Sequence, residues 1–172
     1  MSEPTVIDTG TPELLAQLDA GVLTLTMNRP DARNAMSRAM NTALQEQLAL
    51  AEFNHAVRCI VLTGAGKGFC AGGDVKSFSE IVKTTTGEER RRQVEYRIHD
   101  LHPLVLLMRR MPKPIIASVQ GAAAGAGLSF AMACDLIIAA DTAFFTLAYI
   151  NIGTSPDGSG TYFLPRLVGL KK

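Results

Sequence analysis

Two glycine-rich stretches decide the fold of this chain of 172 residues: Gly64-Ala-Gly-Lys-Gly-Phe-Cys-Ala-Gly-Gly73 and Gly121-Ala-Ala-Ala-Gly-Ala-Gly127. Each comes directly after a short run rich in β-branched residues, 58–63 and 115–120, as is typical of a buried strand. Glycine has no Cβ, so such stretches form loops whose backbone can approach another group closely. A strand followed by a glycine loop, found twice, indicates an α/β architecture if helices lie between the strands.

The segment before the first glycine loop supplies the first of these helices. Residues 13–19 and 22–28 are β-prone runs joined by Ala20-Gly21, which predicts a hairpin with a two-residue turn. Ser37 can cap a helix that runs to about residue 53, because apolar residues recur along it at spacings of three and four. The predicted order is therefore strand, strand, helix, strand.

The segments after the two loops continue the alternation. We expect a short helix at 74–82, a mobile charged surface segment at 83–92, and a helix at 93–110 that Pro103 bends or interrupts. After the second loop we expect a helix at 128–134 and a strand at 136–140.

The composition indicates one folded domain, residues 1–172, with a flexible N-terminus at residues 1–12. The 17 basic and 16 acidic side chains nearly balance, which argues against a nucleic-acid groove and a polybasic membrane patch. The three cysteines have no CxxC or Cys/His spacing, so neither a disulfide framework nor a metal site is expected. Polar residues and glycines interrupt the apolar stretch 115–140, and no signal peptide is visible, so we expect no membrane span and a cytoplasmic location.

Neither glycine stretch fits a nucleotide-binding pattern. Gly64 to Gly68 lacks the earlier glycine of a phosphate-binding loop, and Gly68 stands where a Ser or Thr must bind magnesium. The second stretch has Phe130 at the third glycine of a dinucleotide fingerprint. What remains is two loops with uncovered backbone N–H groups near helix starts, which attract negative charge. Two such loops that converge would form an oxyanion hole, although each loop alone is also compatible with tight packing.

Four motifs follow one another along the chain: Asn28-Arg-Pro-Asp-Ala-Arg-Asn-Ala35, Phe69-Cys-Ala-Gly-Gly-Asp74, Gln120-Gly-Ala-Ala-Ala-Gly-Ala-Gly-Leu-Ser129 and Ser155-Pro-Asp-Gly-Ser-Gly160. Together they resemble the crotonase superfamily, the enoyl-CoA hydratase/isomerase family. The resemblance implies a crotonase-like spiral of repeated β-β-α units, of which this chain would be the N-terminal core portion without the usual C-terminal helical region. It also implies fatty-acid metabolism, an acyl-CoA thioester substrate and a homotrimer or hexamer. No separate cofactor is expected, since coenzyme A enters as part of the substrate.

The resemblance also assigns roles to residues. The backbone N–H groups of Gly73 and Ala126 would bind the thioester oxygen. The positions that line the coenzyme A site in the family are here Ala32, Arg33, Ala71, Asp74 and Gly125. From the residues alone, Arg33 is also compatible with a simple surface arginine, and a structural role is favoured over a catalytic one for Asp74.

The acid/base positions depart from the hydratase pattern. A hydratase of the family uses two glutamates, and the matching residues here are Ser129 and Tyr149. The remaining carboxylate is Asp157, where isomerase branches of the family carry theirs, although Pro-Asp-Gly is also an ordinary turn sequence. One carboxylate beside an oxyanion hole suffices for a 1,3-proton shift. We therefore expect an acyl-CoA isomerase, shifting a double bond or rearranging a ring-bearing acyl-CoA.

Two alternatives stay open at this stage. The first is an enoyl-CoA hydratase or another acyl-CoA lyase or hydrolase, using Asp157 with a different partner. The second is a fragment that binds a CoA thioester without catalysis.

Overall fold

The computed structural model describes residues 3–171 and confirms the α/β fold. Its main sheet has six strands in the order β1-β2-β3-β4-β5-β7, and β6 and β8 form a separate pair. The strands are β1 (Thr5–Ile7), β2 (Leu14–Asp19), β3 (Val22–Met27), β4 (Cys59–Gly64), β5 (Ile115–Val119), β6 (Ala122–Ala124), β7 (Leu136–Ala139) and β8 (Phe144–Thr146). Strands β1 to β3 are antiparallel, whereas β3, β4, β5 and β7 run parallel and need crossover connections.

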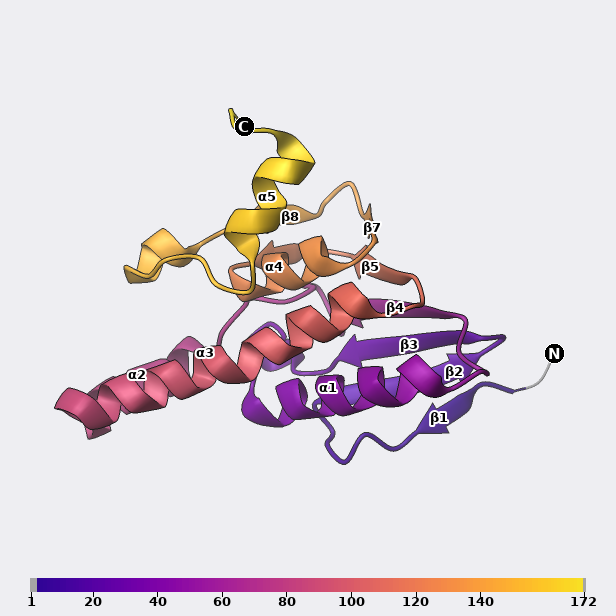
Figure 1. The fold of residues 1–172 in the computed structure, drawn as a ribbon, viewed down its shortest axis with the longest axis horizontal. Helices are drawn as coiled ribbons and strands as arrows, with labels where there is room; N and C mark the ends of the chain where they lie inside the picture. The colour runs from indigo at the N-terminus through magenta and orange to yellow at the C-terminus, as the bar shows by residue number, and fades with distance from the viewer. Residues whose placement is uncertain (1–2, 172) are drawn as a thin grey trace.

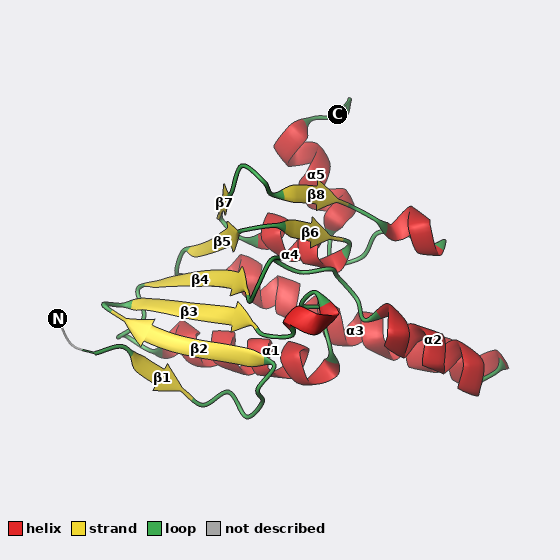
Figure 2. Ribbon diagram, turned by 180° about the vertical axis from the view of Figure 1, so that it is seen from behind, coloured by secondary structure: helices red, strands yellow, loops and turns green. Residues whose placement is uncertain are grey.

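The helices are α1 (Arg38–Phe53), α2 (Val75–Thr84), α3 (Gly87–Arg110), α4 (Ala126–Ala133) and α5 (Gly160–Val168). Those that lie between parallel strands in the sequence provide the crossovers, and α1 and α3 lie on one face of the main sheet (Figures 1 and 2). Buried side chains from the sheet, α1, the second half of α3 and α4 form one hydrophobic core. Because β3, β4, β5 and β7 run parallel, their carboxyl ends and the loops that follow them lie at one common edge of the sheet.

The N-terminal elements agree closely with the sequence prediction. The hairpin pairs Asp19 with Val22 across the Ala20-Gly21 turn, in which both central residues have positive φ. Ser37 caps α1 by accepting a hydrogen bond from the N–H of Met40. No helix in residues 3–171 is long and apolar enough to span a membrane.

Three local predictions differ from the structure. Residues 5–7, placed in a flexible terminus, form β1 and pair with β2. The segment 83–92 is helical except at the junction of α2 and α3, because the Arg90 side chain donates to the backbone oxygens of Val82 and Thr85 and so caps the end of α2. Pro103 does not interrupt α3, whose apolar side packs into the core around it.

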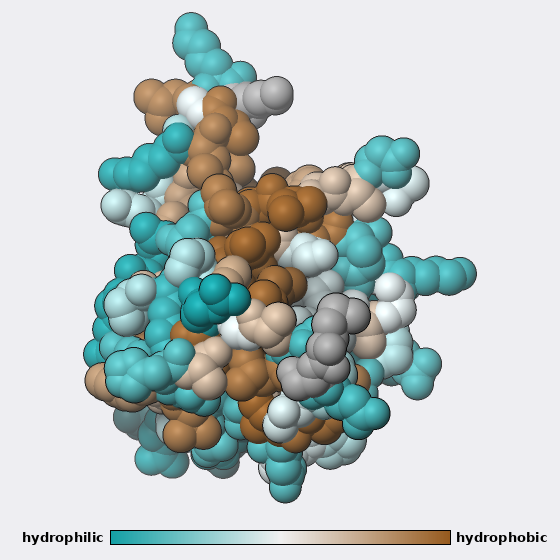
Figure 3. Space-filling model, turned by 90° about the vertical axis from the view of Figure 1, so that its right-hand side faces the viewer, coloured by the Kyte–Doolittle hydropathy of each residue, from teal (hydrophilic) through white to brown (hydrophobic). Residues whose placement is uncertain are grey.

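Apolar side chains are exposed over the last third of the described chain. Figure 3 shows hydrophobic atoms forming a band over the face on which the edge strand β7 lies, towards the C-terminal end. All four residues of β7 are exposed, and Phe144 of β8 and Tyr162 of α5 keep 60% and 54% of their surface accessible. A contiguous apolar surface on an edge strand is typical of an interface.

Candidate active site

The N-terminal motif fixes the first glycine loop in place. The buried Asn34 side chain donates from Nδ2 to the backbone oxygens of Ala65 (2.9 Å) and Gly68 (2.8 Å). Farther along, the N–H of Ala71 donates to the oxygen of Arg33 at 3.0 Å, and the N–H of Met36 to that of Gly72 at 2.8 Å. The loop is therefore held along its length before it reaches the start of α2.

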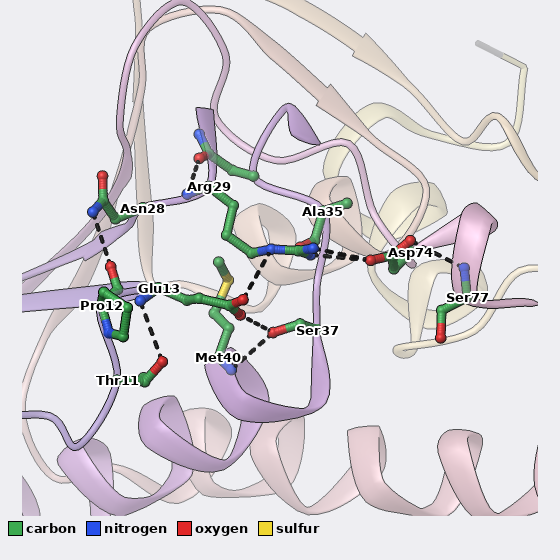
Figure 4. A network of polar contacts seen from close by, with 11 residues as sticks. Thr11, Pro12, Glu13, Asn28, Arg29, Ala35, Ser37, Met40, Asp74 and Ser77 are labelled. Carbon is green, nitrogen blue, oxygen red and sulfur yellow. Dashed lines mark hydrogen bonds and ion pairs between the residues drawn. The ribbon is translucent and has the colours of Figure 1, made fainter. Parts of the chain in front are cut away.

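Asp74, which follows the loop, is bound on both carboxylate oxygens (Figure 4). Its Oδ1 accepts from the N–H of Ser77 at 3.2 Å and so caps α2, while its Oδ2 accepts from the Arg29 guanidinium at 3.1 Å. Arg29 also pairs with Glu13 at 3.4 Å. Burial alone would raise the pKa of Asp74, but the Ser77 N–H and Arg29 outweigh it and hold the pKa below its ordinary value. Asp74 is thus a stable anion within a structural network.

The second glycine loop meets the first at the start of α4. A Cβ on Gly72 would lie 3.0 Å from the nitrogen of Ala126, so the two loop backbones are in direct contact. Gly125 has φ +52° and its N–H donates to the oxygen of Thr146, which leaves Ala126 as the first helical residue. Within residues 3–171, neither the Gly73 nor the Ala126 N–H donates to a protein acceptor. Both N–H groups are therefore available to a ligand.

A cavity of about 560 Å³ opens beside these two N–H groups. It lies between the glycine loops, the start of α1, and α2 and α3. Gly73, Asp74, Ala126 and Asp157 all line it, so residues far apart in the sequence meet in one place. Part of its wall is apolar and comes from Phe78, Ile81, Ile98 and Leu101.

Asp157 is held differently from Asp74. Its Oδ1 accepts a 2.6 Å hydrogen bond from the hydroxyl of Tyr149, and its backbone oxygen accepts from Ser129 Oγ at 3.0 Å. Its Oδ2 has no hydrogen-bond donor within residues 3–171. Burial, and next the hydrogen bond to Asp157, raise the pKa of Tyr149, so the phenol stays protonated and acts as a donor.

The packing around Ser129 explains why this position is small. Ser129 is fully buried on α4, and a Cβ on Gly158 or Gly160 would lie only 2.9 or 3.0 Å from its side chain. The chain from Asp157 to Gly160 therefore lies against Ser129. A glutamate at position 129 would have to displace this segment.

The five residues expected at the coenzyme A site fall into two groups. Arg33 is exposed and Ala71 hydrogen-bonds to it, and Ala32 precedes Arg33 in a 3-10 turn, so these three lie together at the surface. Asp74 lies at the cavity wall, and Gly125 adjoins Ala126 without lining the cavity itself. The structure brings the predicted oxyanion residues and Asp157 into one cavity, whereas the coenzyme A roles stay predictions.

Sequence reasoning missed the contribution of α3 to this cavity and the contacts of Tyr149 and Ser129 with Asp157. Tyr96, Arg97 and Leu101 of α3 line the cavity, yet no motif marks them. No cysteine of residues 3–171 lines this cavity, and burial raises the pKa of the Cys70 and Cys134 thiols to about 12. Among residues 3–171 no three His, Cys, Asp or Glu side chains cluster as a metal site would require.

Comparison with known proteins settles the family. The sequence model described as enoyl-CoA hydratase/isomerase matches residues 17–172. The chain belongs to this family. The resemblance to the crotonase superfamily seen in the four motifs is thereby confirmed.

Members of the enoyl-CoA hydratase/isomerase family with different names resemble the chain. It is 40% identical over 156 residues to a 1,2-epoxyphenylacetyl-CoA isomerase of Escherichia coli (strain K12), covering 91% of this chain and 58% of that protein. It is 37% identical over 159 residues to a probable enoyl-CoA hydratase of Rhodobacter capsulatus, covering 91% and 57%. A crystal structure of an enoyl-CoA hydratase from Polaromonas sp. JS666 superposes with a TM-score of 0.81 at 38% identity, over 89% of this chain and 58% of that one. The chain thus spans somewhat more than half the length of these relatives.

Proposed function

We propose that the protein is an acyl-CoA isomerase that moves a double bond, or rearranges a ring-bearing acyl group, through an enolate. The observation that carries this proposal is that two free backbone N–H groups line the same cavity as the Asp157 carboxylate, whose Oδ2 accepts no hydrogen bond within residues 3–171. The similarity to a relative named as an isomerase supports the same choice.

In the proposed reaction the glycine loops stabilise the enolate and Asp157 transfers the proton. The thioester oxygen binds to the N–H groups of Gly73 and Ala126, which stabilise the negative charge as it develops on the enolate. Asp157 Oδ2 removes a proton from one carbon of the acyl chain and returns it to another. The carboxylate is regenerated at the end of each turnover, so no further acid or base is consumed.

A one-step hydration fits this cavity less well. Hydration requires one group that deprotonates water and another that protonates the substrate carbon. At the two positions where hydratases carry glutamates the chain has Ser129 and Tyr149, and both hydroxyls contact Asp157. Tyr149 stays protonated, because its pKa is raised by burial, and so does not replace a carboxylate base.

The test is an assay of the products formed from a 3-enoyl-CoA, a 2-enoyl-CoA and an aromatic acyl-CoA, analysed by mass spectrometry. An isomerase changes retention time without changing mass. The proposal is rejected if the main product is heavier by one water. Binding of all three thioesters without any turnover would instead favour a non-catalytic thioester-binding role.

We also propose that the chain associates with itself through the apolar surface of β7, β8 and α5. Leu136 and Ile138 of β7 keep 59% and 64% of their surface exposed, a liability for an isolated edge strand. Light scattering during size exclusion should give a mass well above that of one chain. A monodisperse monomer would contradict this proposal and leave the isomerase proposal unaffected.

A further inference from the structure

We propose that Tyr149 and Ser129 position Asp157 for proton transfer, Tyr149 by fixing one carboxylate oxygen and Ser129 by fixing the backbone at that residue. This inference rests on the proposed function, because it concerns how the proposed base is held. It assigns a new task to two positions that a hydratase would use for acid/base chemistry.

The hydrogen bonds define the geometry. The Tyr149 hydroxyl carries one proton and gives it to Asp157 Oδ1 at 2.6 Å, a short distance typical of a hydroxyl bound to a charged acceptor. The Ser129 hydroxyl lies 3.3 Å from the Tyr149 hydroxyl and donates to the Asp157 backbone oxygen at 3.0 Å. Each of the two hydroxyls thus contacts both the other hydroxyl and Asp157.

Burial makes this arrangement stiff. Tyr149 is 8% exposed and Ser129 is fully buried, so a hydroxyl that left Asp157 would have little access to water as a replacement partner. Gly158 and Gly160 pack against Ser129 on the other side. The carboxylate plane of Asp157 is therefore fixed at one oxygen, and Oδ2 is left as the proton acceptor. Holding a base within a few tenths of an ångström of its productive position is what proximity catalysis requires.

Protons balance without any contribution from Tyr149. Oδ2 takes a proton from the acyl carbon, and the electron pair of the broken C–H bond passes into the enolate. Oδ2 then returns that proton to the second carbon as the new C–H bond forms. Because the phenol stays protonated throughout, it holds the carboxylate but does not relay the proton.

Tyr149→Phe keeps the ring and removes only the donor. With 3-hexenoyl-CoA as substrate, we expect kcat to fall by about 10- to 100-fold while KM changes less than about threefold, because the thioester contacts are elsewhere. Tyr162→Phe is the matched control: it keeps the ring on the apolar surface of α5, removes a hydroxyl that lies outside the cavity, and should leave kcat unchanged. Ser129→Ala should lower kcat by a smaller factor, again at nearly constant KM.

A double-mutant cycle separates positioning from general structural damage. Tyr149→Phe added to Asp157→Asn should cause no further loss of kcat, because the carboxylate it positions is already gone. Two outcomes overturn the inference: unchanged kcat in both Tyr149→Phe and Ser129→Ala, or equal losses from Tyr149→Phe with and without Asp157. If the melting temperature of Tyr149→Phe lies far below that of the wild type, Ser129→Ala tests the inference instead. A lower kcat at nearly constant KM in that variant supports a positioning role, and an unchanged kcat contradicts it.

The failure of this inference is distinguishable from failure of the proposed function. If Asp157→Asn alone retains full activity, the proposed base is wrong, whatever Tyr149 does. If Asp157→Asn abolishes turnover and Tyr149→Phe and Ser129→Ala do not lower kcat, only the positioning role is wrong.

Discussion

Asp74 and Asp157 line the same cavity, yet the hydrogen bonds to their carboxylate oxygens differ. Asp74 has both oxygens bound, one by a helix N-terminus and one by Arg29, and these contacts hold its pKa low. Asp157 has one oxygen bound by a neutral tyrosine and the other free. A carboxylate must offer a free oxygen to accept a proton from carbon, so of these two residues Asp157, and not Asp74, fits the proposed role of the base.

The largest expected effect comes from exchanging each carboxylate for an amide. Asp157→Asn should lower kcat by about 10²-fold or more, the range that general-base catalysis supplies. Asp74→Asn keeps the helix cap and should change kcat by less than about 10-fold. Steady-state kinetics on a 3-enoyl-CoA measures both variants. A larger loss of kcat in Asp74→Asn than in Asp157→Asn would indicate that Asp74 is the base and that Asp157 is only a turn residue.

The Ala126 N–H, which we propose binds the thioester oxygen, can be removed with Ala126→Pro. Proline is tolerated at the first position of a helix, and Ala126 has that position in α4. We expect kcat to fall by about 10²- to 10³-fold, as for the loss of one oxyanion-hole donor. Val75→Pro removes the corresponding N–H of α2, outside the cavity, and serves as the control. Similar kcat values for the two variants would contradict the assignment.

The structural role of Asp74 predicts an effect on stability. Asp74→Ala removes the cap of α2 and the ion pair with Arg29, and should lower the free energy of unfolding by about 1–3 kcal/mol. Glu80→Ala removes only an exposed pair with Lys83 and should cost at most about 0.5 kcal/mol. Urea denaturation of the three proteins measures the difference. Equal midpoints for Asp74→Ala and the wild type would show that the network contributes nothing.

The smallest effect is the pH dependence of that stability. Because the pKa of Asp74 is lower in the folded protein than the ordinary 3.8, its contribution is present above the unfolded pKa and is lost as the pH falls through the folded value. Between pH 5 and about pH 3, the wild type should lose more stability than Asp74→Asn, in which this group does not titrate. Parallel denaturation midpoints for the two proteins over that interval would contradict the low pKa.

Local patterns predicted the elements that depend on neighbouring residues. The Ala20-Gly21 turn and the Ser37 cap need only nearby contacts, and the structure contains both. The segment 83–92 was misjudged because its order comes from the Arg90 side chain bonding to the end of α2, and a charge run does not reveal that contact.

The candidate site was predictable only in part. The sequence predicts the two glycine loops and their uncovered N–H groups, because only small residues permit the close approach of Gly72 to Ala126. The bond between Tyr149 and Asp157 depends on how the segment 157–160 packs on Ser129, which is a tertiary contact without a sequence pattern. The α3 side chains at the cavity wall were missed for the same reason.

Transfer of a labelled proton tests the central claim most directly, namely that one carboxylate serves both carbons. A 3-hexenoyl-CoA that carries deuterium at carbon 2 is converted in ordinary water in a single turnover, and the 2-enoyl product is analysed by mass spectrometry. If Asp157 Oδ2 both removes and returns the proton, part of the deuterium appears at carbon 4 of the product. One deuterium of a doubly labelled carbon 2 stays there, because only one of its two hydrogens is removed. A product that carries only solvent hydrogen at the newly protonated carbon 4 would contradict the account.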